Sequence, residues 1–177
     1  MRRLFLGLTA ALMAVTVVAA PAAAASAGAK PGSATIVGIV LAPDGEFDVL
    51  QAAVVKAGLV DALNGRSQHT VFAPTDAAFI GTFERLLGTT LTEQDVIAFI
   101  NAGGVDAAFG NGALADVLLY HVTSGRRTST SVLAAPRYTM LDGETLTRTQ
   151  LLAAGVSATD ISASNGVIHV IDAVLLP

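Results

Sequence analysis

Three histidines are the side chains of this sequence best suited to metal binding or acid–base chemistry: His69, His121 and His169. They lie far apart in the chain, and no HxH or HExxH pattern joins two of them. A three-histidine metal site would therefore have to be assembled by the fold. The sequence favours histidines that are buried and hydrogen-bonded in the core. The alternative is a pocket lined by His121 and His169, which would serve a small ligand, a metal ion or a weak enzyme.

Nucleophilic and phosphate-transfer chemistries have less support in the sequence. No serine stands in a GxSxG or SxxK pattern, and no cysteine is present to act as a nucleophile or a thiolate ligand. Close carboxylate pairs, such as Glu93 with Asp95, fall where helix starts and turns are expected. We expect a protein that is not an enzyme and that needs no cofactor and no metal.

Two neighbouring arginines, Arg126 and Arg127, stand in a segment rich in serine and threonine, 123–131. A pair of guanidinium groups can hold a phosphate or an acidic glycan through bidentate hydrogen bonds. The same composition is typical of a solvated surface loop. The sequence leaves both interpretations open.

Residues 1–27 have the three regions of a secretory signal peptide. Two arginines follow Met1, an uncharged apolar run extends to Ala20, and small residues follow Pro21. Removal of this segment takes away two of the ten basic residues and none of the 14 acidic ones, which leaves a formal net charge of −6. That charge argues against nucleic acid and anionic membranes as partners. We expect a secreted, extracellular protein without stable membrane insertion, free or associated with the cell wall.

The rest of the chain is predicted to be a short linker, 28–33, and one domain, 34–177. Helical spacing of apolar residues dominates the first two thirds, and β-prone runs are concentrated in the last third, including a hairpin around Asp142-Gly143. This distribution predicts the α+β class. Residues 101–112 contain four glycines and are predicted to form a loop.

The last segment reads SNGVIHVIDAVLLP, from Ser164 to Pro177. Alternation along a strand places His169 and Asp172 on opposite faces, and both faces are otherwise apolar. An interior strand covered on two sides is therefore expected. The two polar residues then cannot form a catalytic pair, and each needs its own hydrogen-bond partner in the core.

Two blocks of this sequence carry a resemblance to a known family. TVFAPTDAAF, from Thr70, and NGVIHVIDAVLLP, from Asn165, look like the two signature blocks of the fasciclin (FAS1) domain family, in the family's order and at about its spacing. Between them, LLYHV from Leu118 is similar to a further element of that family. The resemblance covers nearly the whole mature chain, although the segment 147–160 looks shorter than the family's strand pair.

The resemblance implies an α+β wedge in which a helical cluster packs on two small β-sheets around one core. It also implies a non-catalytic module for cell adhesion or extracellular matrix interaction, whose partner is a cell-surface or matrix protein or a glycan. Tyr120 and His121 match a tyrosine–histidine motif implicated in receptor contact in animal relatives. The helical stripe directs His121 inward, so Tyr120 is expected to be the more exposed. With Arg126 and Arg127 they form the expected interaction surface.

The polar residues of the two signature blocks are expected to be structural. Thr75 and Asp76 look like helix-capping residues behind the first block. Asn165, His169 and Asp172 are expected to determine how the closing strand docks.

Overall fold

The structure is a computed structural model of the chain, and it describes residues 32–42 and 45–177. The predicted signal peptide, 1–27, and most of the predicted linker, 28–33, lie outside the described residues. Within the described ranges, no helix is both long enough and apolar enough to cross a bilayer.

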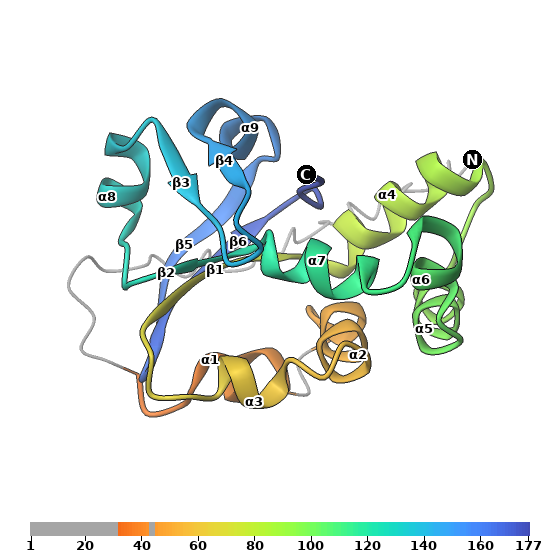
Figure 1. Cartoon of the computed structure of the whole chain (residues 1–177), viewed down its shortest axis with the longest axis horizontal. Helices are drawn as coiled ribbons and strands as arrows, with labels where there is room; N and C mark the ends of the chain where they lie inside the picture. The colour runs from red at the N-terminus through yellow and green to blue at the C-terminus, as the bar shows by residue number, and fades with distance from the viewer. Residues whose placement is uncertain (1–31, 43–44) are drawn as a thin grey trace, which may run out of the picture.

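Helices and strands follow one another as expected for the α+β class, and the predicted class is confirmed (Figure 1). The helices are α1 (Ile36–Val40), α2 (Asp48–Lys56), α3 (Val60–Leu63), α4 (Asp76–Leu87), α5 (Glu93–Asn101), α6 (Gly104–Phe109), α7 (Ala113–Leu119), α8 (Ser129–Ala134) and α9 (Arg148–Ala153). The strands are β1 (His69–Pro74), β2 (Val122–Ser124), β3 (Arg137–Thr139), β4 (Thr145–Thr147), β5 (Val156–Ala163) and β6 (Gly166–Ile171).

The central sheet has four strands in the order β2-β1-β6-β5. The closing strand β6 runs parallel to β1, with His69 opposite Gly166 and Pro74 opposite Ile171, and antiparallel to β5. All six residues of β6 are buried. The prediction of an interior closing strand is therefore confirmed.

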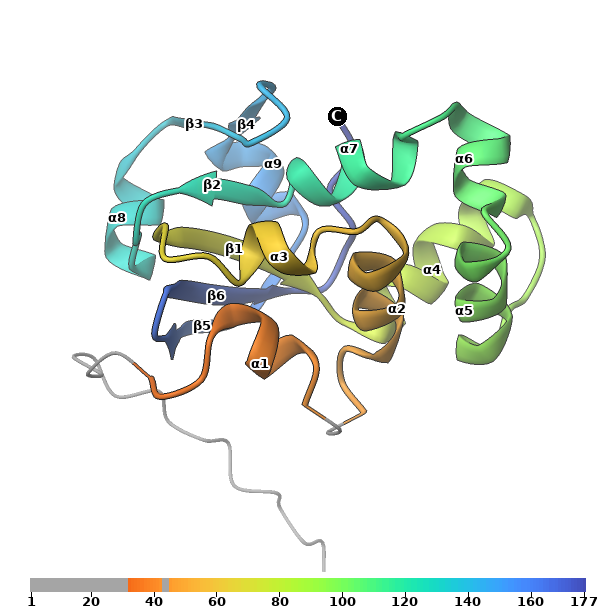
Figure 2. The same ribbon diagram turned by 60° about the horizontal axis from the view of Figure 1, so that its bottom comes forward.

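A second, two-stranded sheet is formed by β3 and β4, which pair antiparallel around the predicted Asp142-Gly143 turn. Together with α8 and α9 it lies over one face of the central sheet, while α1 to α3 lie on the other side (Figures 1 and 2). Helices α4, α5 and α6 extend the molecule at one end (Figure 1).

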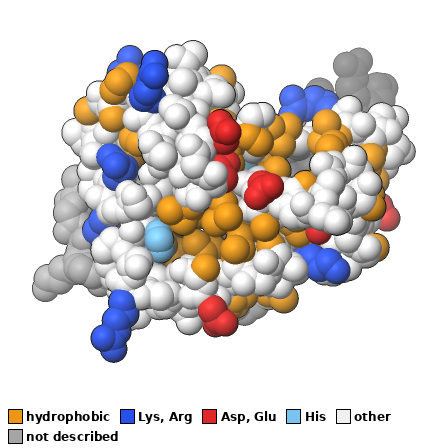
Figure 3. All heavy atoms as spheres, in the orientation of Figure 1, with side chains coloured by type: hydrophobic (Ala, Val, Ile, Leu, Met, Phe, Trp, Pro, Cys, Tyr) orange, Lys and Arg blue, Asp and Glu red, His pale blue; other side chains and the backbone are white. Residues whose placement is uncertain are grey.

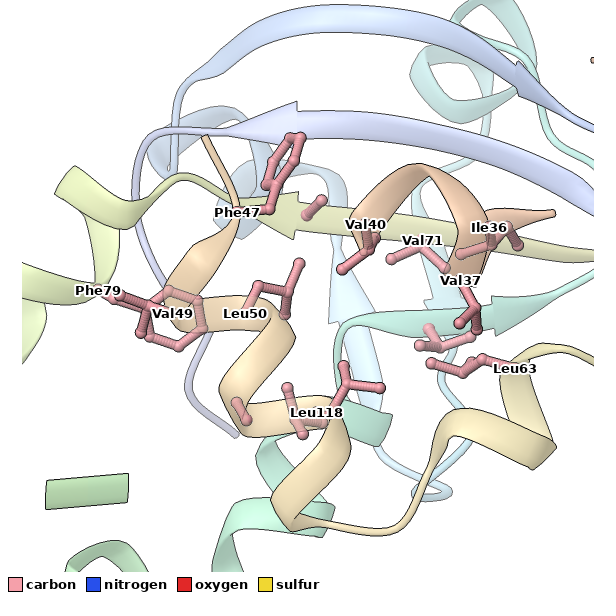
Figure 4. Packing of buried hydrophobic residues seen from close by; sticks show 14 of the residues in the cluster. Ile36, Val37, Val40, Phe47, Val49, Leu50, Leu63, Val71, Phe79 and Leu118 are labelled. Carbon is pink, nitrogen blue, oxygen red and sulfur yellow. The ribbon is translucent and has the colours of Figure 1, made fainter. Parts of the chain in front are cut away.

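Strand alternation divides the buried side chains between the two faces of the central sheet. Val71 and Ile168 point into a first core group beneath the helices, which Figure 4 shows around Leu50 and Leu118. Phe72 belongs to a second core group, closed by the small sheet. Each fully buried aliphatic or aromatic side chain of this kind contributes about 2 kcal/mol relative to exposure, so the sheet is stabilised from both sides.

Helix caps that are readable in the sequence are formed as predicted. The Thr75 side chain accepts the amide of Ala78 at 3.2 Å at the start of α4. Thr92 and Asp95 form a capping box at the start of α5. Each cap satisfies amides that have no partner within their own helix.

Two local predictions differ from the structure. Residues 101–112 are not a continuous loop, because α6 starts after Gly103, whose φ of 79° lies in the left-handed region that glycine tolerates. The segment 123–131 opens as strand β2 on the free edge of β1 and ends in helix α8. The segment 147–160, which looks shorter than the family's strand pair, contains α9 and the start of β5, and β5 pairs with β6 in the central sheet.

Candidate functional site

The Tyr120-His121 pair lies where α7 ends and the chain enters β2. Tyr120 is the C-cap of α7, so it no longer follows the helical stripe from which its exposure was predicted. Its side chain is 2% exposed and packs in the second core group with Phe72, Met140 and Leu146. The expectation that Tyr120 is surface-exposed is wrong, because the small sheet covers this position. Burial raises the pKa of its hydroxyl, and the nearby Asp142 carboxylate adds to that rise.

His121 is buried, as predicted, and both of its ring nitrogens are hydrogen-bonded to the backbone. Nε2 accepts the amide of Leu175 at 2.9 Å, so Nδ1 carries the proton and donates to the carbonyl of Val117 at 2.7 Å. Burial lowers the pKa of the ring to about 4. The neutral imidazole thus links the end of α7 to the C-terminal segment.

His169 sits on the other face of the sheet and is also held by backbone groups. Its Nδ1 accepts the amide of Asp160 at 3.3 Å, and Nε2 donates to the carbonyl of Arg127 at 3.0 Å. The ring stacks on Phe72 with 5.7 Å between centroids. Burial lowers its pKa, partly offset by the Arg127 carbonyl and the Asp160 carboxylate.

The two histidines do not share a pocket. His121 borders an apolar hollow under α1 and α2, whereas His169 lines a different cavity of about 180 Å³ beside Ser129 and Val132. In both rings the lone pair that a metal would need is already used by a backbone amide. The hypothesis of one pocket lined by His121 and His169 is therefore wrong for this fold.

The third histidine, His69, begins β1 and is buried with a lowered pKa that results from desolvation. Its Nδ1 has no hydrogen-bond partner among the described residues. The Gly166 backbone opposite it comes so close that a side chain on residue 166 would overlap the His69 carbonyl. The Asn165-Gly166 turn therefore requires glycine for sheet closure.

Arg126 and Arg127 follow β2, and both serve structural contacts. The Arg126 guanidinium donates to the carbonyls of Ala163 at 2.9 Å and Gly166 at 2.8 Å, and also to the Ser162 hydroxyl. These bonds fix the segment to the turn between β5 and β6. The segment is therefore not a freely solvated loop.

Arg127 is half-buried and lies against Tyr138 of β3. Its backbone amide donates to Thr70 Oγ1 at 2.9 Å, and its guanidinium carbon stands 5.6 Å from the centre of the Tyr138 ring. Burial raises the pKa of Tyr138, while the charges of Arg127 and Arg148 act to lower it. Arg137 precedes Tyr138 in β3, and its side chain is exposed whereas that of Tyr138 is buried.

Asn165 is the most fully used polar residue of the signature blocks. Its Oδ1 accepts the amide of Ile36 at 2.8 Å, and its Nδ2 donates to the carbonyls of Leu63 at 2.8 Å and Gly65 at 3.0 Å. One buried side chain therefore attaches α1 and the end of α3 to the turn before β6.

Thr75 and Asp76 serve two different helices. Thr75 caps α4, whereas the Asp76 carboxylate accepts the amides of Asp48 at 3.1 Å and Val49 at 3.0 Å at the start of α2. Asp172 differs from expectation: β6 ends at Ile171, and the Asp172 side chain is exposed and not buried within the strand.

Carboxylate oxygens of Asp48, Asp76 and Glu93 lie within 4.8 Å of one another, and they are the group of described residues with spacing suited to a cation. Asp76 already accepts two amides there, and an acidic residue at a helix start is favoured by the helix dipole. Capping of α2 explains the arrangement without a metal.

Sequence patterns did not indicate Asp160, the described non-glycine residue with a positive φ, 61°. It lies at an irregularity in the pairing of β5 with β6. Its carboxylate accepts the amide of Ser129 at 2.8 Å and the Ser129 hydroxyl at 2.5 Å. Aspartate tolerates this conformation better than most residues do, but the irregular pairing and the contact with Ser129 join segments that are distant in the sequence.

The described residues form a mixed four-stranded sheet with helices on one side and a two-stranded sheet on the other. The polar side chains of His121, His169 and Asn165 are hydrogen-bonded to backbone groups. Residues 45–177 match the family described as "Fasciclin domain". The chain therefore belongs to the fasciclin domain family. Members of this family are generally non-catalytic adhesion domains.

Related proteins of known sequence agree with this assignment. The chain is 36% identical to "Protein sll1483" of Synechocystis sp. over 182 residues, which cover 97% of this chain and 89% of that protein. It is 33% identical over 148 residues to "Transforming growth factor-beta-induced protein ig-h3" of Sus scrofa, which cover 78% of this chain but 19% of that longer protein.

A solved structure confirms the fold. A domain pair from "the Insect Cell Adhesion Molecule Fasciclin I" superposes with a TM-score of 0.53 at 18% identity, covering 83% of this chain and 52% of that one. At this level of identity the likeness concerns the fold alone.

Proposed function

We propose that this protein is a secreted, single-domain adhesion or surface-interaction module that acts by binding and not by catalysis. The protein of the solved structure, Fasciclin I, is described as an insect cell adhesion molecule, and the proposal extends this role to the present chain. The non-catalytic part of the proposal is supported by the hydrogen bonds of His121, His169 and Asn165 to backbone groups, because these bonds use the polar atoms of the three side chains.

The proposed contact surface is the arginine face, formed by Arg126, Arg127, Arg137 and Arg148. Arg127 and Arg148 both act on Tyr138, and Arg137 precedes Tyr138 in β3, so three of these residues lie near the small sheet. Figure 3 shows Lys and Arg side chains gathered on the side that carries α8 and β3. The single observation that carries the proposal is this concentration of positive charge on an otherwise acidic chain.

The charge indicates an acidic partner, which is either an acidic segment of a cell-surface or matrix protein or an anionic glycan. Guanidinium groups bind carboxylates and sulfates through paired hydrogen bonds. Tyr120 packs beneath this surface, in the same core group as Tyr138. His121 fixes the end of α7 and borders the hollow under α1 and α2.

Heparin, used as a model polyanion, tests the arginine face. The double variant Arg137→Gln, Arg148→Gln is expected to elute from a heparin column at clearly lower salt than the unaltered chain, because screened charge attraction is lost. The matched control is Lys56→Gln with Arg85→Gln, which removes two positive charges from α2 and α4. Equal elution of the two double variants would refute the arginine face.

Secretion and adhesion are tested separately. The mature protein is expected in the culture medium or cell-wall fraction with an N-terminus near residue 28, as determined by N-terminal sequencing. Immobilised mature protein is expected to retain cells or matrix polymers at physiological salt. Failure to retain cells, matrix polymers or any surface protein would contradict the adhesion function.

A further inference from the structure

An apolar groove of about 370 Å³ runs between α4, α6, α7 and the last residues of the chain. Its floor includes Phe79 and Leu114 of the first core group. Its rim carries three large apolar side chains that remain exposed, Leu86 at 46%, Phe109 at 56% and Leu176 at 47%. Figure 3 shows hydrophobic side chains gathered between α7 and α4, where this groove opens.

The dimensions of the groove suit a small molecule. Ligand pockets commonly have volumes of roughly 300–1,000 Å³, and an apolar cavity of about 150 Å³ is already large enough for benzene. The side chains that line the groove are apolar except for Thr82 and Asp116. A ligand in this groove must therefore be largely hydrocarbon.

Thr82 and Asp116 are the polar residues that line the groove, and the Arg85 guanidinium lies beside Thr82 at its edge. Buried Thr82 of α4 donates to the carbonyl of Ala78 at 2.8 Å, and the Arg85 guanidinium donates to Thr82 Oγ1 at 3.4 Å. A cation is thereby held at the α4 edge. The exposed carboxylate of Asp116 lies on the α7 wall. A negatively charged group on a ligand is attracted by Arg85 and repelled by Asp116.

The fourth wall is the C-terminal segment, which contributes Val174, Leu176 and Pro177. The intervening Leu175 points into the second core group, and its amide donates to His121 Nε2 at 2.9 Å. A buried hydrogen bond therefore keeps this wall in place. His121 is a positioning residue for the groove and does not line it.

We propose that the groove binds a long-chain fatty acid, with the alkyl chain between α4 and α7 and the carboxylate at Arg85. The apolar lining accounts for the alkyl chain. The Arg85 guanidinium beside Thr82 accounts for an acid in preference to an alcohol, and it places the carboxylate at the α4 edge and not at the α7 wall, which carries Asp116. The arginine face lies elsewhere, so this proposal stands independently of the proposed adhesion function.

Isothermal titration of the purified chain with dodecanoate, below its micelle concentration, tests the proposal. One molecule is expected to bind per chain. Binding is expected to tighten about fourfold for each CH₂ added between octanoate and dodecanoate, because each buried CH₂ contributes a nearly constant free energy of transfer.

Two groove-filling variants locate the ligand. Ala113→Trp and Val117→Phe enlarge residues that line the groove, and each is expected to weaken dodecanoate binding at least about tenfold. The matched control, Ala108→Trp, places the same bulk on the exposed side of α6 and is expected to bind normally. Thermal unfolding followed by circular dichroism verifies that each variant is folded.

Arg85→Gln tests the position of the carboxylate. It is expected to weaken dodecanoate about threefold, the size of an exposed ion pair, and to leave dodecanol unchanged. Absence of saturable dodecanoate binding overturns the proposal. So does a folded groove-filling variant that binds dodecanoate as tightly as the unaltered chain. The third contrary result is that dodecanoate and dodecanol bind equally well, both to the unaltered chain and to Arg85→Gln. The groove would instead be an interface between copies of the chain if the unaltered protein bound no dodecanoate, formed a dimer in light scattering, and became monomeric with Phe109→Ser.

Discussion

His121 and His169 each accept one backbone amide and donate to one backbone carbonyl, yet they join different parts of the molecule. His121 connects α7 to the C-terminal segment through Leu175. His169 connects β6 to the irregular part of β5 and to the segment after β2, through Asp160 and Arg127. We call these contacts the His121 junction and the His169 junction.

The surroundings of the two rings differ. At the His121 junction, burial is opposed only by the Val117 carbonyl, and the pKa falls to about 4. At the His169 junction, the Arg127 carbonyl and the Asp160 carboxylate both favour protonation and offset part of the effect of burial. Each of these two histidines therefore joins backbone segments in its neutral form, and the groups around the ring determine how far its pKa is lowered.

The largest expected effect is the loss of the His121 junction. His121→Ala removes two hydrogen bonds, leaves the Leu175 amide buried without a partner and opens a cavity, so the free energy of unfolding should fall by about 4 kcal/mol. Urea denaturation followed by circular dichroism measures it. If His121 is structural, stability is lost before heparin binding is affected. A variant of normal stability with impaired binding would show direct contact with the partner.

Acid should weaken the same junction in the unaltered protein. The unfolded chain binds a proton at His121 near its ordinary pKa of 6.5 and the folded chain only near 4, so stability is complete above 6.5 and declines as the pH falls towards 4. The decline should reach about 3 kcal/mol and level off below pH 4. Denaturation curves from pH 7.5 to 3.5 measure it. Subtracting the curve of His121→Ala from that of the unaltered protein isolates the contribution of His121 from those of His69, His169 and the carboxylates. If the two curves of unfolding free energy against pH were parallel, His121 would not be the source of the decline.

Loss of the His169 junction should cost less. His169→Ala removes two hydrogen bonds and the stacking contact with Phe72, but it opens onto an existing cavity of about 180 Å³ that water can enter. We expect a decrease of about 2 kcal/mol in the free energy of unfolding. A loss equal to that of His121→Ala would remove the distinction between the two junctions.

The smallest difference is expected between two variants of Asp160, beside the His169 junction. Asp160→Ala removes the two bonds to Ser129 and places alanine at a φ of 61°, which should cost about 2 kcal/mol. Asp160→Gly also loses both bonds but tolerates this backbone conformation, so it should be about 1 kcal/mol more stable than Asp160→Ala. Equal melting temperatures for the two variants would show that the backbone conformation is not strained.

Much of the fold was predictable because it depends on short-range chemistry. The Thr75 and Thr92 caps, the hairpin at Asp142-Gly143 and the interior position of β6 all follow from residues a few positions apart. The candidate interaction surface was predicted less well. Arg126 and Arg127 have exposed or half-exposed side chains, but Tyr120 does not, because the sheet that covers it is formed by later residues.

Other contacts of the site join residues too distant for any pattern in the sequence. The Asp76 carboxylate holds the start of α2, Asn165 holds α1, and Asp160 adopts its unusual φ beside the start of α8. The groove could not be predicted because residues 101–112 were expected to form a loop, whereas α6 within them forms one of its walls. Its lining comes from α4, α5, α6, α7 and the C-terminal segment.

By itself, the sequence determined the family, the α+β class, the helix caps and the apolar closing strand, since each depends on residue types at short and regular spacings. The tertiary structure decided which polar atoms are occupied and which apolar side chains stay exposed. It placed Tyr120 and His121 beneath the surface and left Phe109 and Leu176 at a groove. Burial depends on segments that meet only after folding, and local periodicity carries no information about them.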